Sequence, residues 1–395
     1  MSRSLRPPRS GRLAMHSDSS LQDTLGAVPP RSMWVILKRV LVATVIAVVA
    51  LGGAYVLWQT AALESEPGRA GYVDMHVHAA GIGAGGSGAF IAKSIRDGYK
   101  FNFYLKAFDV TLEEIEREGD AVVLRKLSEK ISRSDRVSKA VVLALDGVIG
   151  KDGELDRERT QTYVPNEYLA RELAAFDNLL FGASINPYRK DAIERLEQAK
   201  RNGAVLVKWI PGIMDIDPSD QAIVPFYERM RDLGIPLLSH AGQERSFGES
   251  NDALGDPLLL ELPLQVGVTV ITAHLASTGI IEGQDNFDRL LPLFDKYDNL
   301  YADFSALTQI NRRGYLLRAL AREKLHGRLV YGSDWPLQFF PLVSPWYQFP
   351  RVALSQIKAI QGLDNQWDRD VTLKEAMGVP PSAFERSAQL LGVTP

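Results

Sequence analysis

The chain has 395 residues, of which 24% are charged, and its formal net charge at pH 7 is −3. This length suffices for one large or two medium domains, and the lack of a basic excess argues against nucleic acid as a partner. The sequence contains no cysteine, which excludes disulfide bonds, cysteine-ligated zinc and a cysteine nucleophile. Any metal site must therefore use histidine, carboxylate or lysine-derived ligands.

The first residues are basic, with seven Lys or Arg and two Asp among residues 1–39. Residues 1–32 are rich in Ser, Arg, Pro and Gly and lack apolar periodicity, which is typical of a disordered tail. Nineteen uncharged residues follow at 40–58. As a helix they would span roughly 28 Å, close to the thickness of a bilayer core. We therefore predict a disordered basic tail at 1–32 and a transmembrane helix at 33–60.

The flanks of this helix predict its orientation. Lys38, Arg39 and the earlier arginines precede the uncharged run 40–58, so the positive-inside tendency places the N-terminus in the cytoplasm. The apolar run is longer than the roughly 7–15 residues of a signal peptide, which favours a retained signal anchor over a cleaved signal. A polar linker at 61–70 would then lead to an extracytoplasmic domain at 71–395, periplasmic if the organism is bacterial.

From residue 71 onward, short β-branched runs alternate with amphipathic stretches. Eight runs read as strands, at 72–79, 139–146, 180–186, 204–210, 235–241, 267–275, 299–306 and 328–334. Stretches such as 190–201, 221–233 and 285–297 show the apolar spacing of helices. This alternation predicts an α/β fold, a (β/α)8 TIM barrel closed by a last helix at 382–392. A doubly wound sheet is the alternative, but GIGAGGSG at 81–88 matches neither common nucleotide-binding glycine motif.

Two connections are long, 80–137 after the first strand and 335–381 after the eighth. Both leave the carboxyl ends of strands, where loops build the active site of such a barrel. We expect 81–88 to be a flexible loop over the barrel mouth. The second connection is rich in aromatics and proline, which predicts a lid or a substrate wall.

Four of the six histidines fall near carboxyl ends of predicted strands, and so does one aspartate. His76 and His78 stand at i and i+2 of the first strand, on one face, with Asp74 one layer deeper on the same face. The others are His240, His274 and Asp334, which end the fifth, sixth and eighth strands. Because these ends converge on one rim, and because imidazole and carboxylate suit Zn²⁺, Mn²⁺ or Fe²⁺, the pattern predicts a divalent metal site. His326 precedes the eighth strand and is expected at the opposite face.

The order HxH, Lys, His, His and Asp on strands one, four, five, six and eight resembles the amidohydrolase superfamily. The strings VDMHVHA, KWIPG, PLLSHAG and YGSDWP are similar to its amidohydrolase-related (amidohydrolase 2) branch of metal-dependent hydrolases, over about residues 71–395. The resemblance implies one divalent cation, most readily Zn²⁺, with ligands His76, His78, His240 and Asp334. It also implies that His274 holds either a second metal or the substrate oxygen.

Chemistry suggests the remaining roles. Asp334 could take a proton from water and pass it to the leaving group, and His274 could stabilise an oxyanion. For Lys208, on the fourth strand, the resemblance implies either a carboxylated lysine that bridges two metals or a contact with substrate, and a structural role is the alternative. Glu244, Arg312 and Trp335 follow strand ends and are candidate substrate-binding residues.

These features predict a membrane-anchored, metal-dependent hydrolase that cleaves an amide, lactone or ester bond of a small molecule. A metal-dependent decarboxylase of an aromatic or unsaturated acid is the alternative, which a substrate contact from Arg312 or Arg313 would favour. A non-catalytic anchored barrel is a third alternative. The sequence leaves open the substrate, the native metal, the number of metals and any assembly into a homo-oligomer.

Overall fold

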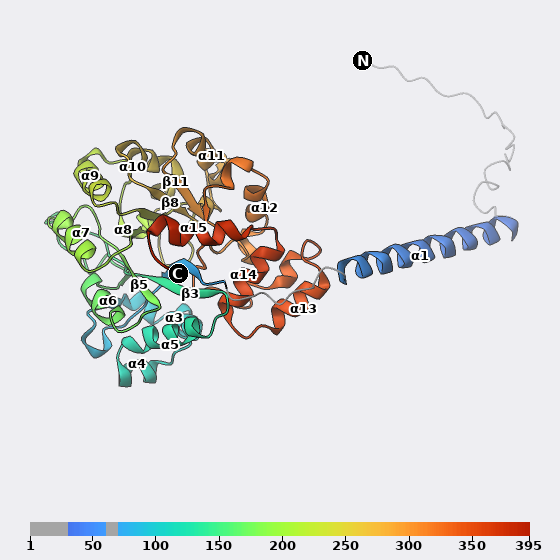
Figure 1. Cartoon of the computed structure of the whole chain (residues 1–395), viewed down its shortest axis with the longest axis horizontal. Helices are drawn as coiled ribbons and strands as arrows, with labels where there is room; N and C mark the ends of the chain where they lie inside the picture. Colours follow the sequence, from blue (N-terminus) through green and yellow to red (C-terminus); the bar gives the residue numbers. More distant parts are fainter. Residues whose placement is uncertain (1–30, 61–69) are drawn as a thin grey trace, which may run out of the picture. The chain divides into compact units, whose positions relative to one another are not determined.

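A computed structural model describes residues 31–60 and 70–395 of the chain. The predicted tail up to residue 30 and the linker at 61–69 lie outside the described residues. Contacts divide the chain into two compact units, Met1–Ala61 and Ala62–Pro395 (Figure 1).

The described part of the first unit is one helix, α1 (Arg31–Thr60). It begins two residues before the predicted start. Its apolar stretch Met33–Gly53 is 21 residues long with a mean hydropathy of 2.3, and these side chains are exposed. A helix of this length and composition can cross a membrane, and a signal sequence meets the same criterion.

The second unit is built on an eight-stranded sheet in which all neighbouring strands are parallel. The strands follow chain order and are β1 (Tyr72–His78), β3 (Val137–Leu143), β5 (Leu179–Ala183), β6 (Leu206–Trp209), β7 (Leu237–His240), β8 (Val270–Ala273), β11 (Leu300–Asp303) and β12 (Leu329–Val330). Each predicted strand is confirmed, and each is shorter than expected. Backbone bonds from Met75 to Tyr331, from His78 to Trp335 and from Asp334 to His76 join the last strand to the first. The sheet is therefore closed into the predicted barrel.

Helices surround the strands (Figure 1). They are α2 (Lys93–Arg96), α3 (Tyr99–Ala107), α4 (Leu112–Glu118), α5 (Ala121–Ser132), α6 (Asn166–Leu173), α7 (Ala192–Arg201), α8 (Pro211–Met214), α9 (Val224–Asp232), α10 (Glu261–Val266), α11 (Asn286–Lys296), α12 (Tyr315–Leu320), α13 (Leu354–Gly362), α14 (Gln366–Ala376) and α15 (Pro381–Leu391). Two small antiparallel pairs join β2 (Phe90–Ile91) to β4 (Thr162–Tyr163) and β9 (Ile280–Ile281) to β10 (Gln284–Asp285). The predicted closing helix is α15.

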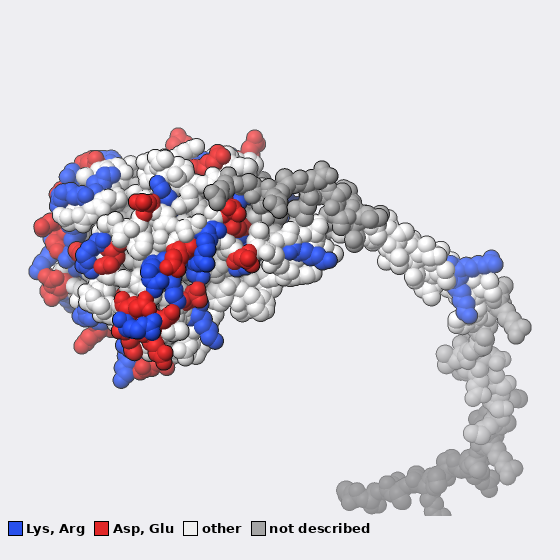
Figure 2. Space-filling view, turned by 60° about the horizontal axis from the view of Figure 1, so that its bottom comes forward, with Lys and Arg blue, Asp and Glu red and all other residues white. Residues whose placement is uncertain are grey.

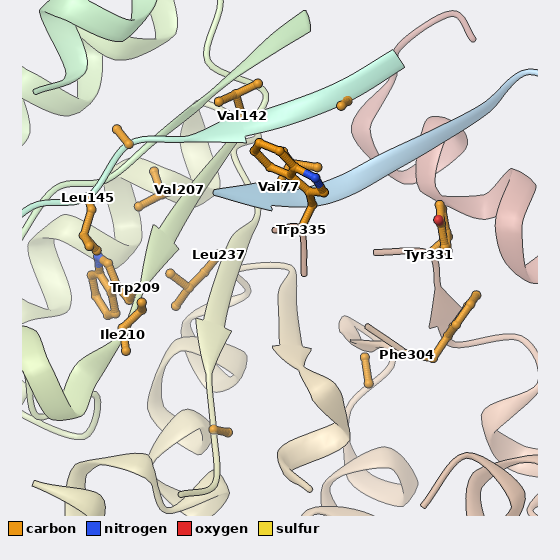
Figure 3. Packing of buried hydrophobic residues seen from close by; sticks show 14 of the residues in the cluster. Val77, Val142, Leu145, Val207, Trp209, Ile210, Leu237, Phe304, Tyr331 and Trp335 are labelled. Carbon is orange, nitrogen blue, oxygen red and sulfur yellow. The ribbon is translucent and has the colours of Figure 1, made fainter. Parts of the chain in front are cut away.

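The core has two layers. One lies inside the barrel and is formed by strand residues such as Val73, Met75, Leu206, Leu238 and Ile271. Ala388 of α15 packs against this layer, so the last helix covers the amino-terminal end of the barrel. The other layer lies between strands and helices, and Figure 3 shows part of it. Apolar filling of the lower barrel leaves its carboxyl end for polar side chains.

The glycine-rich stretch after β1 is held by one carboxylate. Asp120 accepts bonds from the backbone nitrogens of Ile82 and Gly83, both at 2.9 Å, and from the Ser87 hydroxyl. These N–H groups are therefore taken by a protein carboxylate rather than turned toward a phosphate. On the face in Figure 2, Lys and Arg alternate with Asp and Glu over the barrel unit.

Candidate metal centre

The carboxyl ends of the barrel strands bring together the polar residues expected from the sequence. His76 and His78 lie in β1, Lys208 in β6, and His240 ends β7. His274 directly follows β8, and Asp334 comes four residues after β12. All six line one cavity. The predicted convergence on one rim therefore occurs, whereas His326 does not line this cavity and contacts the carbonyl oxygen of Leu320.

A β-bulge in β1 changes which side chains face this rim. The register of β1 against β3 shifts between Asp74 and Val77. Met75 belongs to the core inside the barrel, and the next residue, His76, also reaches inward. Asp74 instead accepts bonds from Trp367 Nε1 of α14 at 2.7 Å and from Ser333 N at 2.9 Å. The expectation that Asp74 shares the face of the two histidines is therefore wrong, because the extra residue of a bulge breaks the alternation of faces.

Three of the expected ligands form a tight group. Asp334 Oδ1 lies 3.1 Å from His78 Nε2 and 3.6 Å from His76 Nε2. The ligand atoms of these three residues all lie within 4.8 Å of one another. His76 is fully buried, and burial together with nearby Lys208 holds the pKa of its imidazole well below the usual value. A neutral ring keeps a lone pair for a cation.

Asp303, at the end of β11, organises the histidines and was not predicted. Its Oδ2 lies 2.7 Å from His76 Nδ1, and its Oδ1 accepts from His274 N at 2.7 Å and from the hydroxyl of Ser305. Because a carboxylate only accepts, His76 must donate through Nδ1, which leaves its Nε2 as the free acceptor. A carboxylate that orients a histidine in this way is typical of metal sites. The position of Asp303 at a strand end in NLYADFSA was the signal that could have identified it.

The positions of the protons also determine the tautomer of His274. The Ser305 hydroxyl has one proton, which it donates to Asp303, and His274 Nδ1 lies 2.7 Å from the same hydroxyl oxygen. His274 must therefore donate through Nδ1, and its Nε2 carries the lone pair. Burial holds the pKa of His274 well below the usual value, so the ring stays neutral. His76, His274 and Asp303 form a second group whose ligand atoms lie within 4.8 Å of one another.

His240 is positioned by a carboxylate of its own. Glu244 Oε2 lies 3.4 Å from its Nδ1, and burial lowers the pKa of the ring. Its Nε2 is buried and has no hydrogen-bond partner among the described residues. His240 stands outside both groups of ligand atoms, but its ring centroid lies 5.4 Å from that of His274. An unpartnered buried nitrogen in a cavity that three other imidazoles line fits a metal ligand, because such a group otherwise costs about 1–3 kcal/mol.

Lys208 is buried in the middle of this group. Its Nζ lies 3.2 Å from His76 Nε2, the atom that a cation would need. Burial lowers the pKa of Lys208 to about 8, against the opposing effect of Asp303 and Asp334. The imidazoles, including the unpartnered Nε2 of His240, and the Asp334 carboxylate suit a divalent cation. A cation bound at His76 Nε2 would require the Lys208 side chain to turn away from this nitrogen.

The structure separates the three expected substrate-binding residues. Glu244 and Arg312 line the cavity, which has a volume of about 170 Å³. Arg312 is buried and donates through one nitrogen to the Ser277 hydroxyl at 2.6 Å, while its Nε has no partner among the described residues. Trp335 does not line the cavity. It is 1% exposed, stacks on Trp367 with ring centroids 5.9 Å apart, and lies beside Val77 (Figure 3).

Comparison with known proteins identifies the family. The amidohydrolase family model matches residues 73–356, more than half of the chain. No curated protein matches. Similar solved structures include an uncharacterised TIM-barrel protein from Bordetella bronchiseptica, with 14% identity, coverage of 81% of this chain and 99% of that one, and a TM-score of 0.49. A putative 2-pyrone-4,6-dicarboxylic acid hydrolase from Pseudomonas putida has 16% identity, coverage of 82% and 97%, and a TM-score of 0.42.

An N-acetyl-D-glucosamine-6-phosphate deacetylase from Mycobacterium smegmatis has 14% identity, coverage of 84% of this chain and 80% of that one, and a TM-score of 0.42. Similarity at this level says nothing about activity. The family match is the informative finding, and it gives no support to the non-catalytic alternative. The chain belongs to the amidohydrolase family, and it is an enzyme of the hydrolase type.

Proposed function

We propose that this amidohydrolase holds a divalent cation, most readily Zn²⁺, through His76, His78, His240 and Asp334, and cleaves an amide, lactone or ester bond of a small molecule. The observation that carries the proposal is the buried, unpartnered Nε2 of His240 in the cavity that the His76–His78–Asp334 group also lines. A bound divalent cation supplies a water of lowered pKa and polarises a carbonyl group.

The side chains around the proposed cation would have separate roles. Asp334 Oδ1 would accept a proton from water and return it to the leaving group. Asp303 fixes the tautomers of His76 directly and of His274 through Ser305. Because His274 Nε2 is an acceptor in this arrangement, His274 suits a second cation or a substrate hydroxyl better than it suits an oxyanion. Lys208, a donor that lines the cavity, is the better candidate to bind the substrate oxygen.

A hydrolysis screen tests the proposal. The full-length protein, loaded with Zn²⁺ or Mn²⁺, would be assayed on esters, lactones and amides. We expect Asp334→Asn to lower kcat by about 10²–10⁴, the usual contribution of a general acid or base. Asp177→Asn, a matched change at an exposed residue, should leave kcat unchanged. The absence of hydrolysis in the metal-loaded protein, or an unaffected Asp334→Asn variant, would count against the proposal.

One observation favours decarboxylation as a second candidate. Arg312 is a buried cation in the wall of the cavity and could hold a carboxylate. Release of CO₂ from aromatic or unsaturated acids, lost in Arg312→Met, would select this alternative. Lack of CO₂ release together with ester or amide hydrolysis would reject it.

We also propose that residues 33–60 are a retained membrane anchor with a cytoplasmic N-terminus, followed by a linker and an extracytoplasmic barrel at 71–395. The length and apolar composition of α1 and the basic residues before it support this topology.

A further inference from the structure

The cavity above the candidate metal centre has two chemically different walls. The charged wall comes from strand ends and the loops that follow them, and includes Lys208, Glu244, Arg312 and Asp334. A second wall comes from the long connection between β1 and β3, with residues such as Ile91, Ile95, Phe101, Leu105, Phe108 and Val123. This second group is called the apolar wall below.

The apolar wall offers almost nothing for a polar ligand. Segment 80–137 contributes many of the described residues that line the cavity. Of these, only Tyr104 has a polar side chain. Its hydroxyl already donates to the carbonyl oxygen of Ser246. Water against such a wall finds no hydrogen-bond partners, so an apolar group displaces it favourably.

Hydrogen bonds join the apolar wall to the loop after β7. Lys100 of α3 donates to the carbonyl oxygens of Arg245 and Phe247, at 3.2 and 3.0 Å, in the loop after β7. The Tyr104 bond to Ser246 adds a third link to the same loop. The apolar surface is therefore built into the site beside the metal-ligand group, and helix α3 and this loop enclose it together.

We infer that the substrate carries an apolar acyl or alkyl group several carbons long beside its scissile carbonyl, and that the apolar wall binds this group. The inference rests on the proposed hydrolase function and names the substrate class for it. Small polar acids would leave the wall in contact with water. An apolar chain fills it while the carbonyl stays near Asp334 and Lys208, so chain length becomes the specificity determinant.

A chain-length series tests the inference. The full-length protein in lipid nanodiscs, loaded with Zn²⁺, would hydrolyse 4-nitrophenyl esters from acetate to decanoate. We expect kcat/KM to rise about fourfold per methylene, which corresponds to about 0.8 kcal/mol for each buried CH₂ group. Ile95→Gln and Leu105→Gln should each flatten this rise. The matched changes Ile193→Gln and Leu258→Gln, at exposed residues outside the cavity, should keep the rise of kcat/KM with chain length.

A binding measurement separates this inference from the proposed function. Hexanoate and octanoate would be titrated calorimetrically into the same nanodisc samples, and the longer acid should bind about fifteenfold more tightly, less so in Ile95→Gln. An active enzyme with a flat or falling chain-length profile would overturn the inference and leave the hydrolase proposal standing. If neither these esters nor the lactones and amides of the hydrolysis screen are cleaved, the hydrolase proposal fails. Equal affinities for the two acids would overturn the inference in either case. Two variants of the apolar wall are used so that, if one misfolds, the other still tests the inference.

Discussion

Replacing Asp303 with asparagine should weaken metal binding without removing any proposed ligand. The new side chain would keep its oxygen toward the three donors now at Oδ1, which are His274 N, Ser305 N and the Ser305 hydroxyl. Its amide NH₂ would then face His76 Nδ1, now 2.7 Å from Oδ2. A donor there forces His76 to carry its proton on Nε2, and this nitrogen loses the lone pair that a cation needs.

The size of the effect follows from the lost contact. A hydrogen bond to a charged group contributes roughly 1.5–3 kcal/mol, and loss of a metal-orienting carboxylate typically lowers affinity 10–100-fold, or about 1.4–2.8 kcal/mol. Both figures lead to the same expectation for Asp303→Asn. Competition between the full-length protein and a chromophoric zinc chelator measures the affinity, with thermal unfolding as a check on the fold.

Asp298→Asn is the matched control, because Asp298 precedes the same strand and is fully exposed. It should bind zinc as the wild type does. A folded Asp303→Asn protein with wild-type zinc affinity would refute the reasoning that Asp303 sets the tautomer of His76.

The remaining predictions concern the scaffold and the anchor. Trp367→Phe removes the donor to the buried Asp74 and should lower the free energy of unfolding by about 1–3 kcal/mol in urea titrations, whereas an unchanged midpoint would argue against the bond. Burial raises the pKa of Asp370, so the native protein holds a proton that the unfolded chain releases near its ordinary pKa of about 3.9. The free energy of unfolding should therefore fall as pH rises from about 4 through the raised pKa of Asp370. Asp370→Asn should lack this pH dependence, and an equal pH slope in both proteins would contradict the assignment. Alkaline carbonate should fail to extract the full-length protein from membranes, and extraction together with a new N-terminus would show a cleaved signal instead.

The barrel could be predicted because its strands are short apolar runs separated by amphipathic helices, a pattern that depends on local sequence. The rim histidines followed from the same count, since each stands at the end of a run. Asp303 was missed because it ends a strand without a neighbouring histidine in the sequence, and its partners come from β1 and β8. Only the folded sheet brings these three strand ends together.

The errors have structural causes as well. The bulge in β1 turns Asp74 outward, and no residue pattern marks the extra residue. Trp335 packs against Trp367 of α14, a contact between segments some thirty residues apart that an aromatic-rich sequence does not reveal. The helices α2 to α5 of the apolar wall have 4 to 12 residues, and the shortest of these are too short for a clear helical period.

Metal content tests the central claim most directly. Full-length wild-type protein, expressed with added zinc and dialysed, would be compared by elemental analysis with His76→Ala and with His326→Ala, a histidine outside the cavity. We expect at least one bound divalent cation per chain in the wild type and in His326→Ala, and a large loss in His76→Ala. A metal-free wild-type protein, or equal metal content in all three proteins, would contradict it.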